Sequence, residues 1–264
     1  MPDRFPAAAV PDLPLTGERT MPGIWHETYW FARHLVVYRW VADRLAGPRG
    51  APGQTGSTDS VLDAGCGEGY GANLLASSTP FAVVGLDYDA ATAQHARRTY
   101  PDVSVVRGNL VTLPFADDSF DGLVSLQTVE HLWDQEAFVA ECARVTAPGG
   151  LVVMSTPNRL TFPPGNICHA RELTAAEFRS LLDRPGLADV TLVGLWHGAR
   201  IEEFQRRHGD VVKAQLAAPP QAWSPDLAEF VASLGPEDFE VGEGDLDSSL
   251  DLVAVARTDT SPTP

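Results

Sequence analysis

The stretch VLDAGCGEGYGANLLA, residues 61–76, decides the fold of this chain. A short apolar run ends at Asp63, glycines follow at positions 65, 67, 69 and 71, and a helical pattern begins directly after them. Glycine lacks a Cβ and adopts positive φ, so such a turn lets backbone amides approach a ligand closely. A strand, a glycine-rich turn and a helix in this order predict an α/β fold with a ligand at the turn; a turn without a ligand is the alternative.

Two acidic residues, Asp63 and Glu68, flank these glycines. The pyrophosphate of a dinucleotide binds bare amides at a helix start and is repelled by carboxylates. A nicotinamide-dependent dehydrogenase is therefore disfavoured, and a ligand with a cationic amine fits better.

Short apolar runs and helical patterns alternate on both sides of the turn. Strands are predicted at residues 60–64, 82–87, 103–107, 120–126, 150–156, 190–195 and 250–256. Helices are predicted at residues 26–46, 70–77, 90–99, 135–146 and 174–183. This alternation is typical of a mainly parallel sheet that helices cover on both faces. A helical insertion at 199–238 breaks the alternation, so the last strand lacks a crossover helix and is expected to pair antiparallel.

The chain is predicted to divide into four parts. A proline-rich flexible arm at 1–15 precedes an N-terminal helical cap at 16–50, and the α/β domain at 51–258 is followed by a tail at 259–264. Within this scheme residues 47–60, rich in glycine, proline and serine, form a linker.

Composition excludes several classes of partner. The chain has 264 residues and a formal net charge of −16, which repels nucleic acid and anionic lipid headgroups. No apolar run approaches the length of about 20 residues needed to span a membrane, and the N-terminus lacks the core of a signal peptide. Cys66, Cys142 and Cys168 form no C-x-x-C pair, which indicates a reducing compartment. We expect a cytoplasmic protein without membrane insertion or nucleic-acid binding.

Polar residues also follow the next two strands. Asp87 ends the second strand, about 20 residues beyond the glycines, where a carboxylate bridges ribose hydroxyls; the alternative is that Asp87 caps the helix that follows. Tyr88 is placed against a purine ring. After the third strand, Asn109 offers an amide edge to adenine and Leu110 an apolar cover.

The motifs VLDAGCGEGYG, VVGLDYD, RGNLVTLPFADDSFDGLVSLQTVEHLWD and APGGLVVMSTPN resemble, in order, those of class I S-adenosylmethionine-dependent methyltransferases. The resemblance spans about residues 60–158. It implies a Rossmann-like, seven-stranded, mostly parallel sheet with an antiparallel last strand, and S-adenosylmethionine as cofactor. It also implies that Gly65 and Gly67 pass under the methionine part, and that Gln127 lies near the methyl group. The full cofactor-binding prediction is Arg33, Asp63, Gly65, Gly67, Gly69, Asp87, Tyr88, Asn109, Leu110 and Gln127.

Arg33 enters this set through the predicted helix at 26–46. It lies four residues from Tyr29, on the same helical face, and is expected to approach the cofactor carboxylate. An amphipathic packing helix with an exposed arginine is the alternative.

Glu130 and His131 follow the fourth strand, where the sulfonium methyl should point. A neutral imidazole accepts a proton from an acceptor hydroxyl, so His131 is the predicted base and Glu130 orients it or binds substrate. A packing role for His131 is one alternative. A second is magnesium, because the segment resembles the E-x-x-E-H motif of ubiquinone-pathway O-methyltransferases. Gln127 replaces the first acidic residue of that motif, which leaves one charge fewer for a cation.

Two later segments supply the predicted substrate residues. The loop after the fifth strand contains His169, Arg171 and Glu172, and the sixth strand ends at Trp196 and His197. This mixture of aromatic and polar groups suits a sugar.

Almost the whole chain, including the flanks LTGERT, YWFARH, HARELT, GLWHGAR and DLDSSLDLVAVA, resembles the sugar O-methyltransferase of the mycobacterial methylglucose lipopolysaccharide pathway. That resemblance implies a glucose hydroxyl, O-3, as the acceptor, on the lipopolysaccharide or a precursor glucan. The rival predictions are a small-molecule or quinone O-methyltransferase, and a non-catalytic protein that binds the cofactor for a partner.

Overall fold

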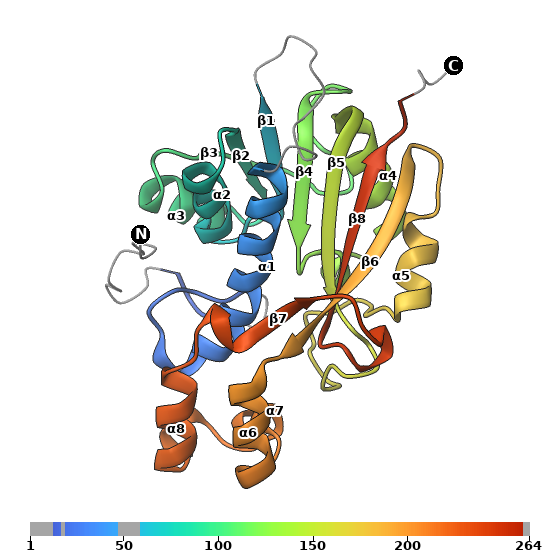
Figure 1. Cartoon of the computed structure of the whole chain (residues 1–264). Coiled ribbons are helices and arrows are strands. Elements are labelled where there is room, and N and C mark those ends of the chain that lie inside the picture. Colours follow the sequence, from blue (N-terminus) through green and yellow to red (C-terminus); the bar gives the residue numbers. More distant parts are fainter. Residues whose placement is uncertain (1–12, 17–18, 47–58, 261–264) are drawn as a thin grey trace.

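The computed structural model describes residues 13–16, 19–46 and 59–260, which form one twisted sheet with helices on both faces (Figure 1). The strand order is β3-β2-β1-β4-β5-β8-β6-β7. The first five strands in this order are parallel, β8 pairs antiparallel with both β5 and β6, and β7 pairs antiparallel with β6. The strands are β1 Ser60–Ala64, β2 Ala82–Asp87, β3 Ser104–Arg107, β4 Phe120–Leu126, β5 Thr146–Pro157, β6 Leu187–His197, β7 Phe239–Gly242 and β8 Asp251–Thr258.

All seven predicted strands are present, but the prediction of a seven-stranded sheet was wrong, because the sheet has eight. The additional strand is β7, which pairs with the end of β6 from Gly194 to His197. Its four residues are too few to show a period-two pattern, and the preceding helical insertion hides it. Phe239 packs β7 against the first turn of the helix at Thr28–Ala46, where its buried ring lies 5.4 Å from the ring of Tyr29.

The sheet has a separate hydrophobic core on each face, because successive side chains of a strand point to opposite faces. Val61 and Val124 face the core under α1 (Thr28–Ala46), α2 (Tyr70–Ser78) and α3 (Ala90–Thr99), whereas Leu62 and Leu123 face the core under α4 (Gln135–Val145) and α5 (Ala175–Leu182). In Figure 1, α1 crosses one face of the sheet.

The insertion before β7 is made of short helices. They are α6 (Ala199–His208), α7 (Val211–Leu216) and α8 (Pro225–Ala232), and they pack beside the start of α1 (Figure 1). Phe204 and Phe230 join α6 to α8 through stacked rings 3.8 Å apart. None of the described helices is long and apolar enough to cross a membrane. Most of the predicted arm at 1–15, the linker at 47–60 and the end of the tail lie outside the described residues.

The parallel register brings the carboxyl ends of β1, β2, β4 and β5 to one edge of the sheet. In open α/β sheets ligands bind outside this edge. The glycine turn, Asp87, Gln127 and the loop after Pro157 all leave the sheet there.

Candidate active site

The turn after β1 depends on glycine at two positions. Gly65 has φ +88°, and an added Cβ would lie 2.4 Å from Thr128 Oγ1, so no side chain fits. Gly67 has φ +54°, and an added Cβ would meet no atom within 4 Å, so this part of the turn is open to a ligand. Gly69 (φ +102°) provides the left-handed residue that starts α2. The backbone of this turn is therefore accessible, as the sequence predicts.

The carboxylate of Asp87 closes the turn from β2. It accepts hydrogen bonds from the backbone N–H of Gly67 (3.0 Å) and of Asp89 (2.9 Å). Burial raises the pKa of this carboxyl. The helix cap of α3 is Asp89, which accepts from Thr92 N at 2.8 Å, so the alternative that Asp87 caps this helix was wrong. Asp87 is left facing the turn, and its ribose contact remains a prediction.

The three predicted adenine contacts lie on the neighbouring loops. Tyr88 is 66% exposed, whereas Leu110 is buried. The side-chain oxygen of Asn109 accepts a hydrogen bond from Val111 N at 3.1 Å. Arg107 Nε donates to Tyr88 O and joins the two loops. Their roles remain predictions.

The two acidic residues that flank the glycines are both buried. Asp63 accepts from Tyr38 OH at 3.2 Å, and burial raises the pKa of Asp63 to about 7. Glu68 accepts from Tyr100 OH at 3.0 Å and contacts His95, and burial likewise raises the pKa of Glu68 to about 7. Glu68 thus braces α3 against the turn, and the contacts of Asp63 and Glu68 with a ligand remain predictions.

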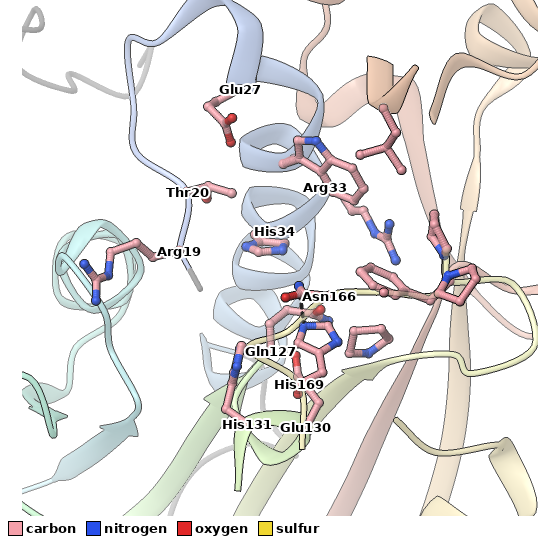
Figure 2. Close-up of a pocket in the computed structure, with 17 residues that line it drawn as sticks. Arg19, Thr20, Glu27, Arg33, His34, Gln127, Glu130, His131, Asn166 and His169 are labelled. Carbon is pink, nitrogen blue, oxygen red and sulfur yellow. Dashed lines mark hydrogen bonds between the residues drawn. The ribbon is translucent and has the colours of Figure 1, made fainter. Parts of the chain in front are cut away.

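A cavity of about 480 Å³ opens at the same edge of the sheet (Figure 2). Residues of α1, of the segment after β4 and of the loop after β5 enclose it. It is lined by Arg19, Thr20, Glu27, Trp30, Arg33, His34, Gln127, Glu130, His131, Pro157, Phe162, Pro163, Pro164, Gly165, Asn166, His169 and Leu216. Its volume suits a small-molecule substrate.

Gln127 is held in a strained conformation on the wall of this cavity. Its φ is +51°, which is uncommon for a residue with a side chain. The backbone N–H donates to Ser155 O at 3.1 Å, and the side-chain amide donates to Ser155 Oγ at 3.2 Å. Such strain concentrates at functional sites, and Gln127 belongs both to the predicted cofactor set and to the cavity lining.

Glu130 and His131 form the floor of the cavity on the short helix η2 (Val129–His131). Glu130 is 1% exposed, and burial raises its pKa to about 8, an effect that a side-chain hydrogen bond with Thr156 partly offsets. His131 Nδ1 lies 2.9 Å from Cys168 O. Because a carbonyl only accepts, this nitrogen carries the hydrogen, and Nε2 carries the lone pair.

Of the five predicted substrate residues, only His169 lines the cavity. Glu172 lies behind it and accepts from its Nδ1 at 2.8 Å. Arg171 is 59% exposed and pairs with Glu177 outside the cavity. Trp196 packs over Gly194, and His197 is bonded to Tyr29 OH at 2.7 Å, where burial lowers the histidine pKa to about 4. Arg171, Trp196 and His197 were predicted to bind substrate, but the structure places them outside the lining of this cavity.

Arg33 lines the cavity, but its guanidinium is committed to Asp251 on β8. Nε and an Nη donate to the two carboxylate oxygens at 2.8 and 2.5 Å, and both side chains are buried. A further bond reaches Leu250 O at 2.8 Å. The arginine is thus neither exposed nor unpaired, and its contact with a cofactor carboxylate remains a prediction.

Several site residues escaped the sequence prediction. Phe162 and Asn166 lie in the loop TFPPGNICHARELT, whose length and position after a parallel strand marked it as a site for specificity without selecting individual residues. Glu27 precedes α1. Asp251 had one signal, an acidic residue at the head of an otherwise apolar strand.

Replacing Asp87 with alanine should weaken the binding of S-adenosylhomocysteine at least about tenfold, since a hydrogen bond to a charged acceptor contributes about 1.5–3 kcal/mol. The turn also loses the acceptor for Gly67 N. Calorimetric titration measures the effect. Asp89→Ala is the matched control, because it removes the α3 cap and leaves cofactor affinity unchanged. An unchanged affinity in Asp87→Ala would remove this residue from the cofactor site.

Replacing Cys66 with alanine should preserve most of the turnover. Its thiol is buried in the glycine turn, and burial raises its pKa well above the usual range, so no thiolate chemistry is expected of it. Initial rates with and without a reducing agent test this. Loss of turnover with intact cofactor binding would assign chemistry to the thiol.

Comparison with known proteins agrees with this geometry. Residues 62–154 match the family model described as a methyltransferase domain. A probable S-adenosylmethionine-dependent methyltransferase of Mycolicibacterium smegmatis is 47% identical over 263 residues, covering 95% of this chain and 98% of that protein. A protein of Mycobacterium tuberculosis with the same description is 45% identical over 256 residues, covering 92% and 89% of the two chains.

Solved structures show the same fold at low sequence identity. A putative methyltransferase of Haloferax volcanii, in complex with the activator Trm112, aligns with a TM-score of 0.58 and 20% identity over 91% of this chain and 96% of the other. A [4+2]-cyclase aligns with a TM-score of 0.54 and 17% identity over 85% and 80%. The fold therefore carries more than one chemistry, and it is the full-length sequence similarity that decides membership. With that similarity, the chain belongs to the class I S-adenosylmethionine-dependent methyltransferases.

Proposed function

We propose that the protein transfers a methyl group from S-adenosylmethionine to a sugar hydroxyl, O-3 of glucose, in methylglucose lipopolysaccharide or a precursor glucan. The observation that carries this proposal is the cavity at Gln127, which combines an aromatic wall with a few polar groups. The resemblance of the flanking segments to the methylglucose lipopolysaccharide enzyme supports the same acceptor.

The cavity lining fits a neutral sugar. Trp30 and Phe162 offer aromatic surface, on which the C–H face of a pyranose packs, and their ring centroids are 6.4 Å apart. Glu27 and Asn166 offer hydrogen-bonding groups for its hydroxyls. Burial raises the pKa of Glu27, and its carboxylate oxygens are acceptors for sugar hydroxyls. The net charge of −16 repels an anionic acceptor and does not oppose a neutral glycan.

Methyl transfer then needs position and the loss of one proton. The acceptor oxygen must come within about 3–3.5 Å of the methyl carbon. It attacks that carbon, the carbon–sulfur bond breaks, and S-adenosylhomocysteine leaves with the electron pair. Glu130 and His131 line this cavity and are the groups proposed to deal with the hydroxyl proton. One route is His131 as general base through the lone pair of Nε2, and the other is a cation held by the two residues.

Transfer of a radiolabelled methyl group to a panel of glucosides, gluco-oligosaccharides and catechols tests the proposal. Label is expected on glucosides and gluco-oligosaccharides and not on catechols. A glucoside already methylated at O-3 is the matched control and should accept no label. Labelling of catechols alone would replace the sugar acceptor with a small aromatic one.

The second candidate function is a small-molecule or quinone O-methyltransferase. The apolar wall formed by Pro157, Phe162, Pro163 and Pro164 favours it, because a flat ring packs against such a surface. The third, a non-catalytic cofactor-binding partner, predicts binding of S-adenosylhomocysteine with no labelled product from any acceptor in the panel.

A further inference from the structure

A groove of about 460 Å³ lies between the start of α4 and α5. Its lining includes Trp133 and Glu136 from the start of α4, and Arg171, Glu177 and Arg184 from α5 and the segments on either side of it. We call it the α4–α5 groove. It is separate from the cavity described above, since the two share no lining residue.

The cavity and the α4–α5 groove are nevertheless built from the same two segments. After β4, His131 lines the cavity and Trp133 lines the groove. In the loop after β5, His169 lines the cavity and Arg171 lines the groove. Two residues span at most about 7 Å of chain, so the cavity and the groove are neighbours along both segments. The two segments are tied together where Glu130 O accepts from Arg171 N at 3.1 Å, and a chain molecule that leaves the cavity across this tie reaches the groove.

Trp133 contributes little to the folded core. It is the most exposed of the described aromatic side chains, at 92%. It precedes Asp134, the N-cap of α4, whose carboxylate accepts from Ala137 N at 2.9 Å. An apolar side chain at this position commonly packs on the fourth residue of the helix, which here is Phe138. Phe138 is wholly buried by other residues and the indole stays in water, so the position of Trp133 beside a groove is typical of a binding surface.

The polar walls of the groove are held in place by bonds to each other. Arg171 Nη2 donates to Glu177 Oε1 at 3.1 Å, and Arg184 Nη1 donates to Glu136 O at 2.9 Å, which joins α5 to α4. Glu177 also forms the capping box of α5 with Thr174. Side chains that are already fixed lose little conformational entropy when a ligand binds. The groove is therefore organised in advance for a ligand that has many hydrogen-bonding groups.

The composition of the groove fits a neutral sugar better than an ion or a protein. Its charged groups nearly balance, because three carboxylates face two guanidinium groups: Asp134, Glu136, Glu177, Arg171 and Arg184. Trp133 is the one exposed large hydrophobic side chain in this lining, whereas the centre of a protein interface is a larger apolar area. A single aromatic ring among paired polar groups offers stacking to the C–H face of a pyranose and hydrogen bonds to its hydroxyls.

We propose that the α4–α5 groove is a second sugar-binding subsite, in which Trp133 stacks on one glucosyl unit of the acceptor while another unit of the same chain occupies the cavity. This inference rests on the proposed function and makes it more specific, because it assigns an oligosaccharide or longer glucan as the acceptor in place of a monosaccharide. The groove takes no part in bond making. It adds affinity, because the second unit binds as part of a molecule that is already held in the cavity.

Initial rates of methyl transfer to methyl α-glucoside and to the series from maltose to maltohexaose test the groove. In wild type the KM is expected to fall at least about fivefold along the series, the size of effect that one aromatic stacking contact supplies. Trp133→Ala should remove most of this fall, and Trp133→Phe, which keeps an aromatic ring, should retain most of it. Leu160→Ala is the matched control, since it shortens a side chain of the loop after β5 that is 54% exposed and lines neither the cavity nor the groove. Its length dependence should equal that of wild type.

Calorimetric titration of the S-adenosylhomocysteine complex with maltohexaose measures the subsite without turnover, and Trp133→Ala should bind at least about fivefold more weakly than wild type. Methylation of glucosides with one KM along the series, and equal maltohexaose affinity in the two proteins, would overturn the subsite and leave the proposed function standing. Trp133 would then be a contact for a protein partner. Maltohexaose binding that Trp133→Ala weakens, without methylation of any sugar, would support the subsite and reject the proposed function.

Discussion

Replacing His131 with alanine is expected to lower turnover by about 10²–10⁴-fold, the range typical of lost proton-transfer catalysis. A sugar hydroxyl is a poor nucleophile until its proton is leaving. His131 lies on the cavity floor, where its Nδ1 donates to Cys168 O and its Nε2 therefore carries the lone pair. The variant loses either the proton acceptor or a ligand of the ion that activates the hydroxyl, and both routes predict the same loss.

Initial rates of labelled methyl transfer measure this effect, and calorimetry should show that affinity for S-adenosylhomocysteine is nearly intact. His131→Asn retains a polar side chain of similar reach but no imidazole, and it should be nearly as impaired. His208→Ala controls for the loss of an imidazole elsewhere. If His131→Asn keeps most of the wild-type rate, the residue only shapes the cavity.

Replacing Asp251 with alanine is expected to destabilise the protein by about 3–5 kcal/mol, the cost of leaving a buried charge without its partner. Arg33 and Asp251 are 3% and 0% exposed and form a bidentate pair between α1 and β8. The guanidinium cannot lose its proton, so without the carboxylate its charge is uncompensated in the interior. A melting temperature lower by about 6 °C or more is the expected readout for a chain of this size.

Two further variants separate charge from packing. Asp251→Asn keeps the shape and one acceptor oxygen but not the charge, and it should be destabilised to an intermediate degree. The double variant Arg33→Met, Asp251→Leu removes both charges and should recover much of the stability, because an apolar pair of similar volume is often neutral or better. Wild-type melting of Asp251→Ala would show that the pair adds nothing to stability.

The Arg33–Asp251 pair also bears on the cavity. The guanidinium lies 5.5 Å from the Trp30 ring and 5.8 Å from the Phe162 ring, so it contacts both rings of the aromatic wall and holds them in place. Loss of Asp251 is therefore expected to raise the Michaelis constant for the acceptor as well as lower the melting temperature. Initial rates at varied acceptor concentration, measured well below the melting temperature, test this.

The sequence alone determined the strands and the turn that carries the cofactor prediction. Strands such as Ser60–Ala64, Ala82–Asp87 and Phe120–Leu126 begin and end where predicted, because apolar runs between turn residues are local signals. The glycine-rich turn after Ala64 could also be predicted from the sequence, because the need for positive φ or for close backbone approach selects glycine at single positions. The parallel order then placed Asp87 and Gln127 at one edge without any knowledge of side-chain packing.

Only the tertiary structure decided which side chains reach the cavity. His169 turns inward to meet Glu130 and His131, whereas Arg171, two residues along the same loop, turns outward to Glu177. The direction of a loop side chain depends on the backbone path and on bonds from distant segments, here those from Ala170 and Arg171 to Glu130 O, and no local pattern encodes it. The sequence likewise predicted that Arg33 binds the cofactor carboxylate, because its ion-pair partner Asp251 is 218 residues away and no local pattern indicates it. A buried charge needs an opposite charge beside it, and only the tertiary structure determines which distant residue supplies that charge.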